Sequence, residues 1–408
     1  MPDFIQSGPI TTLHDLGAVD TEAIEQILAA DTQTHQVGLV LPVTASDMRA
    51  DPFGRIVEEL TQVDYIEQIV VTLGVAPNME DYRETVEKIR PLGDRARVLW
   101  TNGERVEGLY NELHEAGLHL GSPGKGQSVW TAFGYLLSNP RLEVFALHDC
   151  DIVYYDRGIP ARLCLPLVHS GLDFEFCKAY YARFTDRMHG RVVRLLVSPI
   201  LNALRTIVGE NRFLSYLQSF RYPLSGEFAV TTNLAKSNRI PCDWGLEVGT
   251  LAEVFRNISL KRVCQVDLCH RYEHKHQSLS VEDPNQGLMK MATDIMTTIF
   301  RTLASMGVVL QAGHFVTLRS AYLRAAQDAI RQYHADALIN GLVLDRHAEE
   351  QAVEGFARQV TVAGEVFTEN PLGGEAIPNW NRVLAAFPDF PQRLWDAARQ
   401  DAEEFSSC

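Results

Sequence analysis

The sequence predicts an α/β protein whose largely parallel sheet is followed by a helical extension. Short apolar runs alternate with helical stretches up to about residue 280, and beyond that point only the helical spacing of apolar residues continues. Such alternation is typical of βα units, in which helices cover both faces of a parallel sheet. The chain of 408 residues is long enough for more than one structural unit. We expect a lead-in at 1–35, a main α/β domain at 36–280 and the extension at 281–408.

Two βα units open the expected sheet. A polar lead-in with one short helix, at about 21–30, precedes them. The first buried strand spans 37–43, a helix around 54–62 follows it, and the second strand spans 66–73. Two such units in succession favour a parallel sheet. A third strand is expected at 97–100.

The second half of the main domain continues this pattern. A turn at 122–127 opens a helix at 128–137, and an apolar strand at 144–147 follows it at once. A helix is expected at 190–208, with an interruption near Pro199 because proline lacks the backbone N–H. Further strands are expected at 174–181 and 263–268.

Beyond Pro284 the apolar residues recur at the spacing of helices. The first helical stripe consists of Leu288, Met291, Ile295, Ile299, Leu303 and Met306. A stripe of this kind is typical of a core or a subunit interface rather than of a cofactor site. Further helices are expected at 321–334 and 348–360.

The composition is that of an ordinary soluble globular protein. The formal net charge of −15 argues against a nucleic-acid surface, which requires a basic stripe, so an anionic substrate needs a local cationic pocket. The seven cysteines contain no Cys-x-x-Cys pair and suggest neither zinc knuckles nor a disulfide scaffold. The first 30 residues lack a basic segment followed by an apolar core, and no window approaches 18 uninterrupted apolar residues. We therefore expect a cytoplasmic protein without a membrane segment.

Two carboxylates follow the buried strand at 144–147. Asp149 and Asp151 are one residue apart in the segment directly after this strand. Ligands of α/β sheets bind beyond the carboxyl ends of the strands. Two aspartates at that place can hold a hard cation such as Mg²⁺ or Mn²⁺, which in turn bridges phosphate oxygens. The alternative is a solvated loop with two ordinary acids.

Lys125 lies between two glycines at the start of a helix, where backbone N–H groups and the helix dipole favour anions. The Gly-x-x-x-x-Gly-Lys-Ser/Thr spacing of a P-loop is absent. Lys125 is thus either a phosphate contact or part of a surface turn. Its place one helix before the two aspartates favours the first interpretation, because both elements project toward the same edge of the sheet.

Three later blocks combine features of a binding site. Residues 221–229 and 243–249 each contain small residues beside a carboxylate, which either let a sugar approach the backbone or form structural turns. The segment after the strand at 263–268 contains His274 and His276. A histidine there can complete the coordination of a metal when carboxylates and phosphates supply the rest. Otherwise the two histidines are exposed loop residues.

Taken in order, these motifs resemble those of the glucosyl-3-phosphoglycerate synthase family, retaining glycosyltransferases of the GT-A fold. The resemblance spans about residues 36–280 and depends on the order of seven pieces rather than on any one of them. The pieces are Leu41-Pro42, Pro123–Gly126, Asp149–Asp151, Arg191-Val192 with Pro199–Leu201, Pro223–Glu227, Gly245–Gly249 and Glu273-His274. The resemblance implies a Rossmann-like GT-A domain for donor and acceptor binding at 36–280, with the helical extension behind it.

The resemblance also implies roles for individual residues. Asp151 and His274 would bind Mg²⁺ or Mn²⁺, and Lys125 would contact the diphosphate of the nucleotide sugar. Arg191 would bind the carboxylate or phosphate of the acceptor, and Glu247 would lie near the reacting sugar. The other nucleotide-sugar residues would be Leu41, Pro42, Gly124, Gly126 and Asp149, and the other acceptor residues Gly226, Glu227 and His276. The implied reaction moves a hexose with retention of anomeric configuration, and it requires no covalent nucleophile.

Some positions depart from the family pattern. Val193 stands where the family has threonine, and His276 stands where it has asparagine. The family's threonine and asparagine help to hold the acceptor, so the loss of their hydroxyl and amide makes glycerate or another small acid an alternative to 3-phosphoglycerate. At the base end, Thr44–Ser46 replaces an acidic residue and Thr72–Val75 replaces Asp-Ser-Gly-Ser, so that a GDP-sugar fits as well as a UDP-sugar. Positive charge for an acidic acceptor would come from Arg187, Arg191, Arg194 and Lys275.

The leading hypothesis is a metal-dependent hexosyltransferase, with glucose as the first choice of sugar and glycerate, 3-phosphoglycerate or a similar small acid as acceptor. Mannosyl transfer from GDP-mannose is one alternative. A nucleotidyltransferase, which releases pyrophosphate from a nucleoside triphosphate, is another, and a non-catalytic nucleotide-sugar-binding protein is the third. We expect a homodimer, and the helical extension either forms its interface or covers the acceptor pocket.

Overall fold

The computed structural model describes residues 6, 8–18, 20–269, 272–273, 287–373 and 376–406. These residues form one eight-stranded sheet with the order β1-β8-β6-β7-β5-β2-β3-β4. The strands are β1 (Thr11–Leu13), β2 (Gln36–Thr44), β3 (Ile66–Gly74), β4 (Ala96–Trp100), β5 (Leu142–Leu147), β6 (Phe176–Tyr180), β7 (Phe228–Thr231) and β8 (Val263–Asp267).

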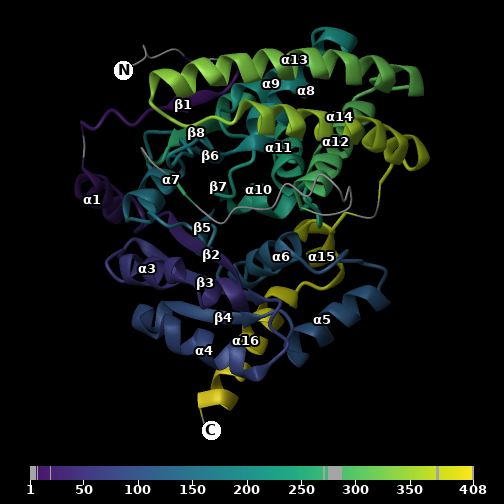
Figure 1. Ribbon diagram of the computed structural model, residues 1–408. Helices are drawn as coiled ribbons and strands as arrows, with labels where there is room; N and C mark the ends of the chain where they lie inside the picture. The colour runs from purple at the N-terminus through teal and green to yellow at the C-terminus, as the bar shows by residue number, and fades with distance from the viewer. Residues whose placement is uncertain are drawn as a thin grey trace.

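The central part of the sheet is parallel, as the βα pattern predicts. Strand β2 pairs in parallel with β3 on one side and with β5 on the other. Successive residues of β2 belong to two different cores: Leu39 and Leu41 pack on one face and Val40 on the other. Figure 1 shows α3 (Asp51–Leu60) and α6 (Lys125–Leu136) on opposite sides of these strands. Burial on both faces explains why the strands are continuous apolar runs.

Two strands were not expected from the sequence. Strand β7 is antiparallel to both β5 and β6, so the sheet is mixed. Strand β1 pairs with β8 at the edge of the sheet and lies in the predicted polar lead-in. Both are only three or four residues long, which is too short for a periodic pattern to be recognised.

Further helices connect the strands. They are α1 (Thr21–Asp31), α2 (Ala45–Met48), α4 (Met79–Ile89), α5 (Glu104–Glu115), α7 (Gly158–Val168), α8 (Ser198–Val208), α9 (Arg212–Ser219), α10 (Thr232–Ser237) and α11 (Leu246–Asn257). The expected interruption near Pro199 is a change of helix type. The turns at Val193–Val197 have π-helical geometry and lead directly into α8. A widened turn accommodates the proline ring, which would clash with the carbonyl four residues earlier in a regular α-helix.

The extension consists of α12 (Gly287–Ser305), α13 (Ala312–Ile339), α14 (Arg346–Glu369), α15 (Trp380–Ala386) and α16 (Phe390–Ser406). Helix α13 packs on α8 and α14, whereas α16 returns along α6 to the edge strand β4 (Figure 1). In the predicted stripe of α12, Ile295, Ile299 and Leu303 are fully buried. The stripe therefore contributes to the core. None of the helices in the described residues has both the length and the apolar character that a membrane span requires.

Candidate active site

A cavity of about 860 Å³ opens beyond the carboxyl end of β5. We call it the site cavity. It is the place where an α/β sheet is expected to bind its ligands. Nine residues with a predicted role line it: Gly124, Lys125, Gly126, Asp149, Asp151, Arg187, Arg191, Gly226 and Glu247. The fold thus brings together residues that are more than 120 positions apart in the sequence.

Lys125 lies at the first turn of α6 and faces two carboxylates. Its Nζ is 2.5 Å from Oδ1 of Asp149 and 3.6 Å from Oε1 of Glu247. Burial by itself would lower the pKa of Lys125, but Asp149 and Glu247 outweigh this effect, and the pKa is raised above its ordinary value. The side chain is therefore a permanent ammonium ion. Any diphosphate that reaches it must replace at least part of these contacts.

Glycines allow the elements around Lys125 to approach one another closely. A Cβ at Gly226 would lie 2.1 Å from Oδ2 of Asp149, and a Cβ at Gly126 would lie 2.0 Å from the carbonyl oxygen of Pro241. A side chain at Gly126 would collide with the backbone of Pro241, and one at Gly226 would force the carboxylate of Asp149 to move. Gly226 thus leaves space for the side chain of Asp149, and Gly126 leaves space for the backbone of Pro241.

A buried polar cluster around Glu227 adjoins Gly226. Both oxygens of Glu227 accept hydrogen bonds, from the hydroxyl of Tyr181 at 2.7 Å and from that of Tyr272 at 2.6 Å. The two tyrosine rings are stacked with their centroids 3.6 Å apart. Burial, reinforced by Asp149, raises the pKa of Glu227. Glu227 is fully buried and does not line the site cavity, so any part it has in acceptor binding is indirect.

Lys178 belongs to the same cluster and was not singled out in the sequence. Its Nζ donates a 2.6 Å hydrogen bond to the carbonyl oxygen of Ser225, directly before Gly226. Burial lowers its pKa to about 8, and the neighbouring Glu247 and Glu227 oppose this shift. A lysine in the middle of an apolar strand such as β6 would have been the only signal in the sequence.

The predicted metal ligands are only partly within the described residues. Asp151 lines the site cavity next to Asp149, whereas His274 and His276 lie outside the described residues. In the part of the chain that is described, no three His, Cys, Asp or Glu side chains are grouped closely enough to hold a metal. Two carboxylates beside a cavity nevertheless fit Mg²⁺ or Mn²⁺, because such ions combine one or two protein carboxylates with phosphate oxygens of the substrate.

Three arginines line the site cavity, and a fourth with a predicted role does not. Arg191 and Arg187 line it as predicted, and Arg183, whose Nη1 donates to the hydroxyl of Tyr222 at 2.8 Å, lines it as well. Arg194 does not line it, because its side chain is nearly buried and pairs with Glu349 on α14. Val193, at the position of the family threonine, is part of the lining.

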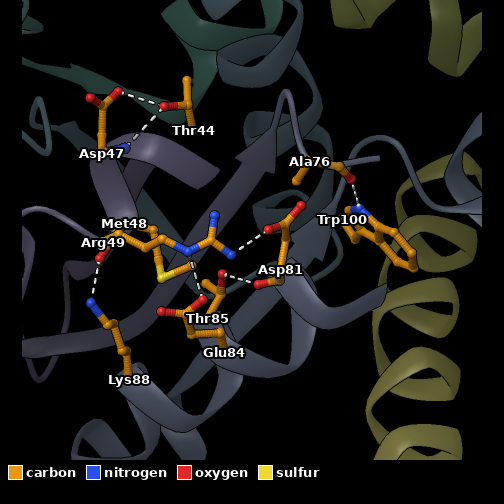
Figure 2. A network of polar contacts seen from close by, with 10 residues as sticks. All are labelled: Thr44, Asp47, Met48, Arg49, Ala76, Asp81, Glu84, Thr85, Lys88 and Trp100. Carbon is orange, nitrogen blue, oxygen red and sulfur yellow. Dashed lines mark hydrogen bonds and ion pairs between the residues drawn. The ribbon is translucent and has the colours of Figure 1, made fainter. Parts of the chain in front are cut away.

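The base end of the site cavity begins where β2 ends. Thr44, Ser46 and Asp47 line it, so an acidic residue, Asp47, directly follows the segment Thr44–Ser46 that lacks one. Figure 2 shows Thr44 donating a hydrogen bond to the carboxylate of Asp47 at 2.7 Å. The same view shows how α2 is held: Arg49, which caps it, contacts Asp81 and Glu84 on α4.

Two other predicted residues of the donor site are not part of the lining. Leu41 is fully buried in the core, and Pro42 lies within β2.

The extension also contributes to the lining, which the sequence did not reveal. Leu288, Lys290, Met291 and Asp294 of α12 line the site cavity, and the loop that contains Trp244 packs against this helix, since a Cβ at Gly245 would lie 2.3 Å from Oγ1 of Thr298. Trp244 is 42% exposed. Helix α12 of the extension therefore forms part of the wall of the site cavity.

Comparison with known proteins identifies the family. Glucosyl-3-phosphoglycerate synthase of Persephonella marina is 44% identical over 401 residues, which cover 98% of this chain and 99% of that protein. The enzyme of the same name from Methanococcoides burtonii is 39% identical over 408 residues, which cover 99% of each chain. The chain belongs to the glucosyl-3-phosphoglycerate synthase family. The resemblance inferred from the seven motifs and the expected enzyme class, a glycosyltransferase, are confirmed. No protein-family model matches the chain.

A solved structure confirms the fold. Glucosyl-3-phosphoglycerate synthase of Mycobacterium tuberculosis, in complex with Mn²⁺, UDP-glucose and phosphoglyceric acid, superposes with a TM-score of 0.52. The match covers 74% of this chain and 90% of that one, at 19% sequence identity. The GT-A fold with a helical C-terminal part is thus the fold of this family member.

Proposed function

We propose that this protein is a glucosyl-3-phosphoglycerate synthase, which transfers glucose from UDP-glucose to 3-phosphoglycerate with retention of anomeric configuration. The observation that carries the proposal is the convergence of Lys125, Asp149, Asp151 and Glu247 on one cavity at the carboxyl ends of the strands. The relatives that match nearly the whole chain have this activity in their names. The M. tuberculosis enzyme binds UDP-glucose and phosphoglyceric acid together with Mn²⁺.

The donor end holds the leaving group. We assign the contact with the diphosphate to Lys125, whose ammonium ion is fixed at the start of α6. Because a fixed positive charge needs no reorganisation as negative charge develops on the departing diphosphate, it stabilises the transition state. Asp151, together with His274 from outside the described residues, would hold Mg²⁺ or Mn²⁺, and the ion would supply Lewis-acid stabilisation of the leaving group.

The acceptor end holds an anion. Arg191, Arg187 and Arg183 give this side of the site cavity a positive character that the protein as a whole, with its net charge of −15, does not have. A guanidinium ion binds carboxylate or phosphate in two-pronged geometry and so orients the acceptor hydroxyl toward the sugar. Glu247 lies between the two ends, within 3.6 Å of Lys125. We assign it to the reacting hexose.

The test is an assay of purified protein with Mn²⁺ or Mg²⁺. Each of UDP-, ADP- and GDP-glucose and GDP-mannose is offered with 3-phosphoglycerate or with glycerate, and the nucleoside diphosphate and the glycoside are both quantified. We expect UDP-glucose with 3-phosphoglycerate to be the preferred pair and the product to be the α-anomer by NMR. Transfer from GDP-mannose alone would replace this function by mannosyl transfer, and release of pyrophosphate from a nucleoside triphosphate would indicate a nucleotidyltransferase. Tight UDP-glucose binding without turnover would support the binding-protein alternative.

Three further expectations rest on the sequence and belong to this proposal. They are a homodimer, a cytoplasmic location, and a division into a donor- and acceptor-binding domain at 36–280 and an extension at 281–408. Size-exclusion chromatography with light scattering tests whether the protein is a dimer, which would have twice the 45.7 kDa mass of a single chain.

A further inference from the structure

We propose that Glu349, on helix α14 of the extension, is a positioning residue that holds the acceptor arginine Arg191 in its working orientation. This inference rests on the proposed function, because it assumes that Arg191 binds the acidic acceptor. It assigns a specific part in acceptor recognition to the helical extension. Glu349 is 158 positions away from Arg191 in the sequence.

The carboxylate of Glu349 is shared between two arginines. Its Oε1 accepts a hydrogen bond from Nε of Arg191 at 2.9 Å, and its Oε2 accepts one from Nη1 of Arg194 at 2.9 Å. Both oxygens are thus in use, and Glu349 is only 5% exposed. A carboxylate that is buried in this way is held firmly only while both partners remain in place.

Arg194 anchors this arrangement rather than binding a substrate. Its Nε donates to the carbonyl oxygen of His189 at 2.9 Å, and its guanidinium lies 5.0 Å from the ring centroid of Tyr333 on α13. The side chain is 10% exposed and does not line the site cavity. With these contacts in place, Arg194 cannot turn toward an acceptor, but it can fix the position of Glu349.

Arg191 has the opposite character. Its side chain is 34% exposed and lines the site cavity. The bond to Glu349 uses only Nε, and among the described residues its two Nη groups have no protein partner. Because Arg191 and Arg194 are three positions apart on one helical segment, both reach the same carboxylate. Because Glu349 engages only Nε, both Nη groups of this cavity-lining arginine are left for a carboxylate or phosphate.

Charge alone predicts the opposite effect from positioning, which makes the inference testable. Removing the negative charge of Glu349 increases the net positive charge beside the acceptor, and this by itself would strengthen anion binding. Removing the hydrogen bond releases a long, flexible arginine side chain, which weakens binding because the side chain must be ordered again for each acceptor. If Glu349 positions Arg191, the second effect prevails.

The experiment compares Glu349→Gln with Glu354→Gln in the full-length enzyme. Glu354 is exposed on the same helix, so the second variant makes the same charge change away from the site. We expect Glu349→Gln to raise the KM for 3-phosphoglycerate about ten-fold, the usual effect of losing a charge-assisted hydrogen bond, with the KM for UDP-glucose unchanged. Glu354→Gln should leave both constants unchanged. Circular dichroism melting of each variant shows whether the fold is intact.

A double-mutant cycle with Arg191→Lys decides whether Glu349 acts through Arg191. Lysine lacks the guanidinium Nε–H that Arg191 donates to Glu349. In the Arg191→Lys variant, Glu349→Gln should therefore raise the acceptor KM little or not at all. Equal effects of Glu349→Gln in both backgrounds would overturn the inference, as would a lower acceptor KM in the single variant. If the unmodified enzyme does not glucosylate 3-phosphoglycerate at all, the proposed function fails instead, and the two failures are distinguishable.

Discussion

At the scale of single residues, the position of Asp149 is fixed from two directions. Lys125 contacts its Oδ1, and the backbone of Gly226 lies so close to its Oδ2 that no Cβ fits between them. Asp149 thereby connects the start of α6 with the segment before β7. The arrangement of Lys125 and Asp149 in the wall of the site cavity depends on this connection.

Replacing Gly226 by alanine should disrupt the donor end without unfolding the protein. The new Cβ would lie 2.1 Å from Oδ2 of Asp149, so that this side chain and the ammonium of Lys125 must both shift. A displacement on the order of 1 Å at a reacting group lowers kcat/KM about a hundred-fold. Steady-state kinetics test this, with Gly54→Ala as the control because a Cβ at Gly54 meets no atom within 4 Å. Unaltered kinetics of Gly226→Ala would mean that Asp149 does not need its present position.

The buried histidine His148, directly before Asp149, should make the stability of the fold sensitive to acid. Burial lowers its pKa from an ordinary 6.5 to about 3, and its Nε2 has no hydrogen-bond partner in the described structure. Between pH 6.5 and about pH 3, the unfolded chain therefore binds a proton at His148 that the folded chain does not bind. The free energy of unfolding falls as the pH decreases through this range. Between pH 6.5 and pH 5 the loss amounts to about 2 kcal/mol.

The variant His148→Gln isolates this effect. Glutamine does not titrate and can still accept the hydrogen bond that the hydroxyl of Tyr155 shares with Nδ1 of His148 at 3.0 Å. Urea unfolding at pH 7.5 and pH 5 should show that the original protein loses about 2 kcal/mol more than the variant. Equal losses in both proteins would show that His148 is protonated in the folded state.

At the scale of elements, the sequence predicted the long apolar strands and several helices, but neither the short strands β1 and β7 nor amphipathic helices such as α4, α5 and α16. The strands at 37–43 and 66–73 were located to within one residue at each end, because burial on both faces makes them continuous apolar runs. Helix α6 was expected from Ser128 but begins at Lys125, since the glycines beside the lysine obscure the helical pattern. The Lys125 and Asp149 motifs are local and were found. The pairing of Arg191 with Glu349 joins two distant segments, and no local pattern contains it.

The start of α6 provides a prediction about the packing of an element. A Cβ at Gly126 would lie 2.0 Å from the carbonyl oxygen of Pro241, so Gly126→Ala should separate the helix from the loop that follows Ile240. Overpacking of this kind destabilises a protein by about 1–3 kcal/mol. At Gly108, in the exposed face of α5, nothing lies within 4 Å, and alanine should instead stabilise the helix by about 1 kcal/mol. Urea unfolding of both variants measures the difference, and a stabilised Gly126→Ala would contradict the close contact.

At the scale of the whole molecule, the extension and the sheet share one hydrophobic core. Residues of α12, α13, α14 and α16 belong to the same buried cluster as Val40, Val70 and Phe145 of the central strands. The indole of Trp380 stacks on that of Trp130 in α6 with the ring centroids 4.2 Å apart. Its Nε1 also donates to the carbonyl oxygen of Trp130 at 3.0 Å. Arg105 of α5 forms ion pairs with Asp401 and Glu404 of α16.

This shared core predicts that the catalytic unit and the extension unfold together. Trp380 is fully buried, so Trp380→Ala should lower the free energy of unfolding by about 3–5 kcal/mol. Hydrogen exchange followed by mass spectrometry should then show peptides of β2 and β5 losing protection to the same extent as peptides of α13 and α14, because a single cooperative unit opens as a whole. Leu372→Ala, at a residue that is 92% exposed in the segment between α14 and α15, is the control and should leave both regions unchanged. Loss of protection confined to the extension would instead show that it is a separate unit, and acceptor recognition through Glu349 would then vary with the docking of the extension.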